Sequence, residues 1–175
     1  MTSGQERAVR ELERLHFADP DSFEILESPQ LINSSLKVLV SLRLGPLQKN
    51  AGGLDLKERE EFVVQIPPDF PFDQPSLSVA HERFAGFPHV NWKRYICLYQ
   101  SNVEWNPADG LYGFFDRLAL WLKRAALNDM DPVEGPLHPP VLIPDWTIPP
   151  FIIRANMPVE AGHSWVGCAE LRIPV

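Results

Sequence analysis

The chain has 175 residues, enough for one domain with an extension, and its 45% hydrophobic and 22% charged residues are ordinary for a globular protein. Its formal net charge of -7 argues against non-specific binding to nucleic acid, which needs a basic surface. No apolar run approaches the ~20 residues of a membrane helix, and the charged N-terminus lacks the apolar core of a secretory signal. We therefore expect a cytoplasmic protein that binds neither nucleic acid nor membrane.

The first half of the chain predicts a helix followed by antiparallel strands. Residues 5–17 carry apolar side chains at helical spacing, with Glu and Arg on the other face, which favours an amphipathic helix. The next apolar runs alternate with polar residues, which is typical of half-buried antiparallel strands. A polar connection containing two glycines separates the two longest runs and predicts a hairpin. We expect a meander of about four strands, at residues 23–26, 35–44, 61–66 and 76–80.

A long loop and a second helix follow the predicted meander. Residues 81–105 show no periodicity, and long irregular loops inside compact domains are usually functional. The helix is predicted from Asn106 to about Ala126, because asparagine is a good N-cap and Pro107 suits the first helical position. The order of elements predicts an α+β domain in which helix and sheet share a core.

The end of the chain is rich in proline, which prevents a long helix there. Residues 151–155 and 164–173 predict strands or extended segments. We expect a domain over residues 1–135 and a proline-rich extension, or a linker towards a further domain, over residues 136–175.

The predicted loop contains Cys97, and its surroundings decide whether this thiol is reactive. A buried cysteine is usually a small hydrophobe, whereas a reactive one needs exposure and electropositive neighbours. Lys93 and Arg94 are close enough in sequence to supply that charge. His89 is the nearest histidine and could act as a base, as a hydrogen-bond donor or as a structural pin for the loop.

Other cysteine and metal chemistry has weaker support. A cysteine hydrolase would need a histidine beside Cys97 and a third group to orient it, and the glycine-rich context of known protease motifs is missing. The five histidines show no metal-ligand spacing, so we expect neither a metal nor a cofactor. In a reducing compartment Cys97 and Cys168 are expected to stay unpaired.

Five short motifs, in this order, resemble those of ubiquitin-conjugating enzymes over about residues 1–135. They are a proline-rich strand and loop, a segment before the cysteine, the cysteine segment, a tryptophan-proline turn and a segment after the second helix. In this chain they read PPDFPFDQPSLSV from Pro67, FPHV (87–90), ICLYQ (96–100), EWNP (104–107) and NDMDP (128–132).

The resemblance implies the fold of that family and its chemistry. Cys97 would accept the C-terminal carboxylate of ubiquitin or a ubiquitin-like protein as a thioester from an activating enzyme, and pass it to an amine on a target. Asp131 matches the family's aspartate that positions and deprotonates the incoming lysine. His89 stands where the family has asparagine, and Phe87 where it has histidine; an imidazole can still donate a hydrogen bond. The implied catalytic residues are therefore Cys97, His89 and Asp131.

The end of the chain departs from the usual family pattern, since a proline-rich segment replaces the last two helices. In this respect the chain resembles bacterial relatives that work with a ThiF-type activating enzyme, often fused in the same chain and often encoded in antiviral defence operons. The implied partners are that activating enzyme, a ubiquitin-like modifier and a target protein. The alternative is a catalytically inactive relative that only binds or scaffolds, although such relatives typically lack the cysteine.

Overall fold

A computed structural model describes residues 1–91, 94–99 and 102–130, all within the compact unit Met1–Leu137. The elements follow in the order α1 (Ser3–Ala18), β1 (Phe23–Ile25), β2 (Gln30–Ile32), β3 (Ser35–Arg43), β4 (Arg59–Ile66), β5 (Ser76–Ser78), β6 (Val90–Asn91), β7 (Tyr95–Ile96), a short 3₁₀ helix η1 (Asn102–Glu104) and α2 (Gly110–Leu127). The predicted α+β class is confirmed. The extended segments predicted at residues 151–155 and 164–173 lie outside the described residues.

The described strands form one seven-stranded antiparallel sheet in the order β1-β3-β4-β5-β7-β6, with β2 also beside β3. The predicted meander is confirmed as β1-β3-β4-β5, and its two longest strands pair from Leu36↔Ile66 to Arg43↔Arg59. The alternation identified these strands because one face of the sheet is buried and the other is not. Val38 and Val64, for example, are buried opposite each other, next to the exposed pair Lys37 and Gln65.

Three short strands, β2, β6 and β7, were not predicted, and β5 is therefore not the last strand of the sheet. Each has two or three residues, too few to produce a recognisable alternation. β2 joins β3 through a two-residue turn at Asn33 and Ser34, whose φ angles are 47° and 66°. Two consecutive positive φ values match the twist of a hairpin, and asparagine tolerates them well.

Helix α1 confirms the helix predicted at residues 5–17, but its buried face is partly polar. Thr2 and Gln5 form a capping box at its N-terminus, and Gln5 and Glu11 are buried together with Ala8 and Leu12. The sequence interpretation had placed all glutamates on the solvent face. Burial is tolerated because each polar group has a partner: the Gln5 amide donates to the Ser34 carbonyl at 2.8 Å.

Glu11 also explains why α2 begins later than predicted. The helix starts at Gly110, with Asp109 in place of Asn106 as N-cap, and the backbone N–H of Leu111 donates to Glu11 Oε2 at 2.8 Å. A carboxylate from another helix thus satisfies a free N–H at the positive end of α2. Gly110 has φ 55° and lies so close that a Cβ there would be 2.6 Å from the Glu11 carboxylate. Asn106 instead closes a turn, accepting from the Ala108 N–H at 3.1 Å.

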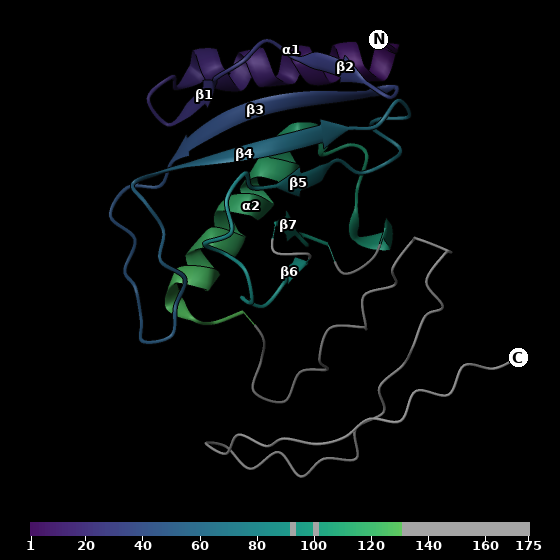
Figure 1. Cartoon of the computed structure of the whole chain (residues 1–175). Coiled ribbons are helices and arrows are strands. Elements are labelled where there is room, and N and C mark those ends of the chain that lie inside the picture. Colours follow the sequence, from purple (N-terminus) through teal and green to yellow (C-terminus); the bar gives the residue numbers. More distant parts are fainter. Residues whose placement is uncertain (92–93, 100–101, 131–175) are drawn as a thin grey trace, which may run out of the picture. The chain divides into compact units, whose positions relative to one another are not determined.

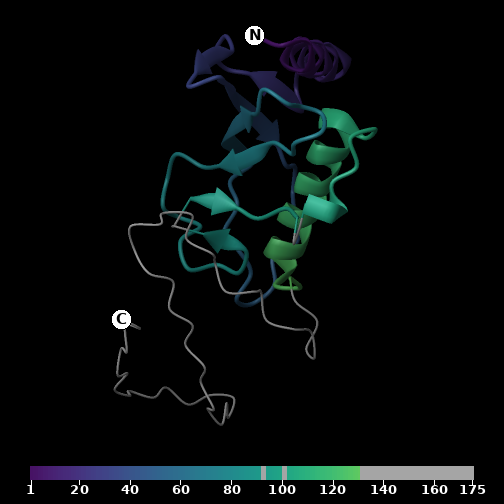
Figure 2. The ribbon, with the colours of Figure 1, turned by 90° about the vertical axis from the view of Figure 1, so that its right-hand side faces the viewer.

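Both helices lie on the same side of the sheet, as Figures 1 and 2 show, and share one core with it. Phe115 of α2 packs edge-on against Phe23 of β1, with ring centroids 4.9 Å apart. One apolar stripe of α2 is buried in this core: Leu111, Phe114, Phe115, Leu118 and Leu122.

A buried charge cluster fixes the start of the segment that leads to Cys97. Glu60 of β4 is 1% exposed and receives two hydrogen bonds from Arg83, at 2.5 and 3.1 Å. His81 Nε2 lies 3.4 Å from the same carboxylate. A buried carboxylate is stable only with such partners, so residues 81–83 are held against the sheet although no periodic pattern marks them.

Candidate active site around Cys97

Cys97 directly follows β7, on a segment held by the core on both sides. Its backbone N–H donates to the His89 carbonyl at 2.8 Å. Ile96 and Leu98 are both buried, at 6% and 8% exposure, while Cys97 itself is half-buried. Since successive side chains of extended backbone point to opposite faces, the two apolar neighbours enter the core and the sulfur faces outward.

Asn91 contacts the sulfur directly, and the sequence interpretation missed it. Its side-chain amide nitrogen lies 2.7 Å from Cys97 Sγ. The short β6–β7 ladder explains the contact. Asn91 pairs with Tyr95, and Cys97 lies two residues beyond Tyr95 on the same face. No spacing rule reveals this, because the two strands were themselves not predicted.

His89 lies beside Cys97: its backbone carbonyl accepts the Cys97 N–H, and the side chains of both residues line one hollow. Its φ angle is 63°, a left-handed conformation that histidine and asparagine adopt more readily than most residues. The position therefore suits either the family's asparagine or the histidine present here. The side chain is half-buried and lines the same hollow as the Cys97 side chain.

Cys97 lies between two open hollows. The first, about 250 Å³, is lined by His89 together with Arg117, Trp121 and Arg124 of α2 and Met130. The second, about 200 Å³, is lined by the proline-rich segment, including Gln74 and Pro75, and by residues that follow β7. An extended peptide could pass through such a pair of hollows with one of its carbonyl groups at the sulfur.

Arg117 of α2 fixes the backbone immediately after Cys97. Its Nε donates to the Leu98 carbonyl at 2.5 Å, and its guanidinium lies over the Tyr99 ring, 4.4 Å from the centroid. A terminal nitrogen is also paired with Glu104. Three successive parts of the segment after Cys97 are thus tied to one helix side chain, which restrains where the sulfur can move.

The two cations that line the first hollow beside the sulfur, Arg117 and Arg124, come from α2 and are not the predicted neighbours Lys93 and Arg94. Arg94 is exposed and pairs with Glu82 at 3.6 Å, and Lys93 lies outside the described residues. Burial raises the pKa of the Cys97 thiol above its ordinary value. At neutral pH most of the sulfur is therefore the thiol, and a donor to the thiolate, such as the Asn91 amide, acts against this effect.

Trp105 links two of the motifs that carry the family resemblance. The indole N–H donates to the Pro71 carbonyl at 2.7 Å, and the ring packs against Phe70 and Tyr99. The tryptophan-proline turn therefore holds the proline-rich segment, which lines the second hollow beside Cys97. Trp105 is itself buried, so its ring is part of the core.

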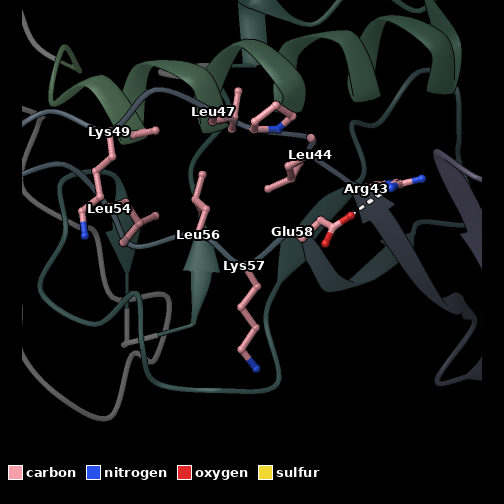
Figure 3. A pocket seen from close by; sticks show the side chains of 11 residues that line it. Arg43, Leu44, Leu47, Lys49, Leu54, Leu56, Lys57 and Glu58 are labelled. Atoms are coloured by element: carbon pink, nitrogen blue, oxygen red, sulfur yellow. Dashed lines mark hydrogen bonds and ion pairs between the residues drawn. The ribbon is translucent and has the colours of Figure 1, made fainter.

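A larger hollow lies elsewhere in the described residues. It has about 650 Å³ and is formed by the connection between β3 and β4 and the end of α2 (Figure 3). Its lining includes the exposed ion pair Arg43–Glu58, and Lys49, which pairs with Asp55. It shares no lining residue with the hollows beside Cys97 and contains no cysteine or histidine, so it offers no nucleophile.

Asp131 and Cys168 lie outside the described residues, which end at Met130, a residue of the first hollow. Within residues 1–91, 94–99 and 102–130, no three His, Cys, Asp or Glu side chains gather as a metal site would require. In the same ranges, neither helix combines the length and the apolar composition of a membrane span.

Residues 23–148 match the family described as prokaryotic E2 family A, and the chain belongs to this family. Its antiparallel sheet and two α-helices therefore form a bacterial ubiquitin-conjugating-like domain. This membership associates the chain with ubiquitin-like conjugation and with the partners of that process, an activating enzyme and a target. No match to the chain is found among curated proteins.

Proposed function

We propose that this chain is a conjugating enzyme that carries a ubiquitin-like modifier on Cys97 as a thioester. The observation that carries the proposal is the placement of Cys97: an outward-facing sulfur between two buried neighbours, open to a hollow on each side. A packed structural cysteine would need no access. The family membership supports the same chemistry.

The proposed reaction has two steps. In loading, Cys97 Sγ loses its proton and attacks the carbonyl of the modifier's thioester on the activating enzyme. A new C–S bond forms, the old one breaks, and the activating enzyme's thiolate takes up a proton. In discharge, a target amine attacks the same carbonyl, a C–N bond forms, and Cys97 leaves as a thiolate while the amine loses a proton. A thiol suits both steps because it is a good nucleophile and a good leaving group.

The raised pKa of Cys97 fits a substrate that is already activated. A thiol that is mostly protonated at neutral pH reacts poorly with an amide, whereas a thioester has a better leaving group and is still attacked by the smaller thiolate fraction. This favours thioester exchange over peptide hydrolysis.

His89 and Asp131 complete the proposed site. His89 takes the family's asparagine position, where its carbonyl holds the Cys97 N–H and its side chain lines the hollow. Asp131 would accept the proton of the attacking lysine amine; it follows Met130 directly in the sequence.

The cellular setting is proposed from the resemblance to bacterial relatives. A ThiF-type activating enzyme, in the same chain or encoded beside it, would supply the modifier, and the system would act in the cytoplasm in antiviral defence. We propose that residues 1–135 form the catalytic domain and residues 136–175 an extension or linker. The family match extends to residue 148, into the first part of that segment.

The test is a comparison of the two cysteines. Cys97→Ser should form a stable oxyester with the modifier or lose transfer, because an alkoxide is a poor leaving group. Cys168→Ser should be loaded and discharged like the wild type. The measurement is single-turnover loading by the activating enzyme, followed on non-reducing gels.

Equal loss of transfer in both variants would contradict the assignment of Cys97. Normal loading of Cys97→Ala would do the same. If an activating enzyme with demonstrated activity loads neither the wild type nor Cys168→Ser, the alternative of an inactive binding or scaffold module is favoured.

A further inference from the structure

The contact between Asn91 and Cys97 has a chemical consequence for the reaction proposed above. The amide nitrogen lies 2.7 Å from Sγ, within reach of an N–H donated to sulfur. An amide N–H can donate to a thiolate but cannot remove the thiol proton, so this contact favours the ionised sulfur without acting as a base.

We infer that Asn91 is a catalytic residue of the proposed transfer, in which its side-chain amide stabilises the Cys97 thiolate. This inference rests on the proposed function. The same thiolate is the nucleophile in loading and the leaving group in discharge, so one donor at the sulfur assists both steps. His89, at the family's asparagine position, contacts Cys97 through its backbone carbonyl instead.

The strand geometry holds the amide in place. The β6–β7 ladder pairs Val90 with Ile96 and Asn91 with Tyr95. Extending this register by one pair places His89 opposite Cys97, which agrees with the hydrogen bond from the Cys97 N–H to the His89 carbonyl. Asn91 is then the diagonal neighbour of Cys97 on the same face, a spacing that an asparagine side chain can bridge.

Several ionisable groups surround the sulfur, and a test must separate Asn91 from them. Burial opposes the thiolate, and the side chains of Arg117 and Arg124 line the same hollow as the sulfur. All of these groups stay in place when only the amide is changed. The ionisable side chains that line the two hollows with Cys97 are His89, Arg117 and Arg124 in the first, and Tyr95 and Tyr99 in the second.

The experiment measures the pH dependence of Cys97 alkylation by iodoacetamide in the full chain with Cys168→Ser, so that Cys97 is the only thiol. Asn91→Ala should move the midpoint of the curve of alkylation rate against pH upward by about one pH unit. This is the size expected for a hydrogen bond to a charged group. The rate at neutral pH should fall only about threefold, because intrinsic thiolate reactivity rises with pKa with a slope of about 0.4–0.5.

Asn91→Asp tests the same contact with a side chain of nearly the same shape. Its carboxylate repels the thiolate, so the midpoint should move further upward than in Asn91→Ala. Asn50→Ala is the control: it removes an exposed amide that bonds the Leu127 carbonyl and should leave the midpoint unchanged. Thermal unfolding followed by circular dichroism shows that each variant is folded, and Asn91→Asp carries the test if Asn91→Ala is not.

Unchanged midpoints in both Asn91 variants would overturn the inference. Alkylation needs neither modifier nor activating enzyme, so its outcome is separate from that of the proposed function. If the midpoints shift but the protein cannot be loaded with the modifier, the donor contact between Asn91 and Cys97 is supported and the proposed transfer is contradicted. If loading is normal and the midpoints are unchanged, the proposed function is supported and the role of Asn91 is contradicted.

Discussion

His89 shows how a single backbone angle can decide which residues a site accepts. At φ 63° most side chains are strained, whereas histidine and asparagine adopt this conformation more readily. The backbone at this position also holds Cys97 by accepting its N–H at 2.8 Å. A substitution at position 89 therefore changes two things, the imidazole and the shape of the loop, and the variant must be chosen to separate them.

His89→Asn removes the imidazole and keeps a residue that tolerates the left-handed backbone. We predict that the imidazole assists the attack of the amine, so this variant should load at the wild-type rate and discharge to free lysine more slowly. The measurement is the decay of the purified thioester with and without lysine. His89→Ala adds backbone strain, so it should also be less stable to heat. Discharge of His89→Asn at the wild-type rate would make the side chain purely structural.

Only some of the residues around Cys97 could be predicted from the sequence. Cys97 could be selected from the sequence because its neighbours matched a family motif. His89 could be selected for the same reason, but its contact with Cys97 through the backbone could not be foreseen. Asn91 carried no motif signal, and only the pairing of β6 with β7 brings its amide to the sulfur.

At the scale of elements, α2 is both a core helix and the support of the site. Its apolar stripe packs against the sheet, and Arg117, on a more exposed part of the same helix, bonds the Leu98 carbonyl. Arg117 is therefore a positioning residue, which acts on the reaction through the backbone that carries Cys97. Its pairing with Glu104 is partly exposed and adds less than the bond to the carbonyl.

Arg117→Ala should slow both loading and discharge, by about tenfold or more, because small displacements of reacting groups have large kinetic effects. It should destabilise the fold by only about 1 kcal/mol, the usual net value of a hydrogen bond. Arg117→Lys keeps the charge but loses the planar fork, so it should recover little of the rate. Single-turnover kinetics and urea unfolding measure the two effects.

Lys123→Ala is the matched control, since Lys123 is an exposed cation on the same helix and lines neither hollow beside Cys97. Its kinetics should equal those of the wild type. Full recovery of the rate in Arg117→Lys, or equal slowing in Lys123→Ala, would indicate that the charge of α2 matters rather than the clamp on Leu98.

The elements differ in how well the sequence predicted them, for physical reasons. β3 and β4 are long and bury one face, so their alternation was clear. The start of α2 was misplaced because the N–H of Leu111, in its first turn, is capped from outside the helix by Glu11, which no local pattern reveals. Glu11 was assigned to the solvent face because a buried polar residue can be recognised only by its partners in space.

At the scale of the whole molecule, the described residues form one core, and the candidate site lies where the last strands of the sheet meet α2. The proline-rich segment, the β6–β7 pair and α2 each contribute residues to the surroundings of Cys97. These parts lie far apart in the sequence, and the order of the five family motifs was what indicated that they come together. The family membership of residues 23–148 agrees with that order.

The central claim is that Cys97 carries the modifier as a thioester, and the most direct test identifies that bond. The wild-type protein is mixed with ATP, the activating enzyme and the modifier encoded beside it, quenched in acid without reductant, and mapped by peptide mass spectrometry. We predict a modifier adduct on the Cys97 peptide that reductant removes and that is absent in Cys97→Ala. An adduct that resists reductant, or one located on Cys168, would contradict the claim.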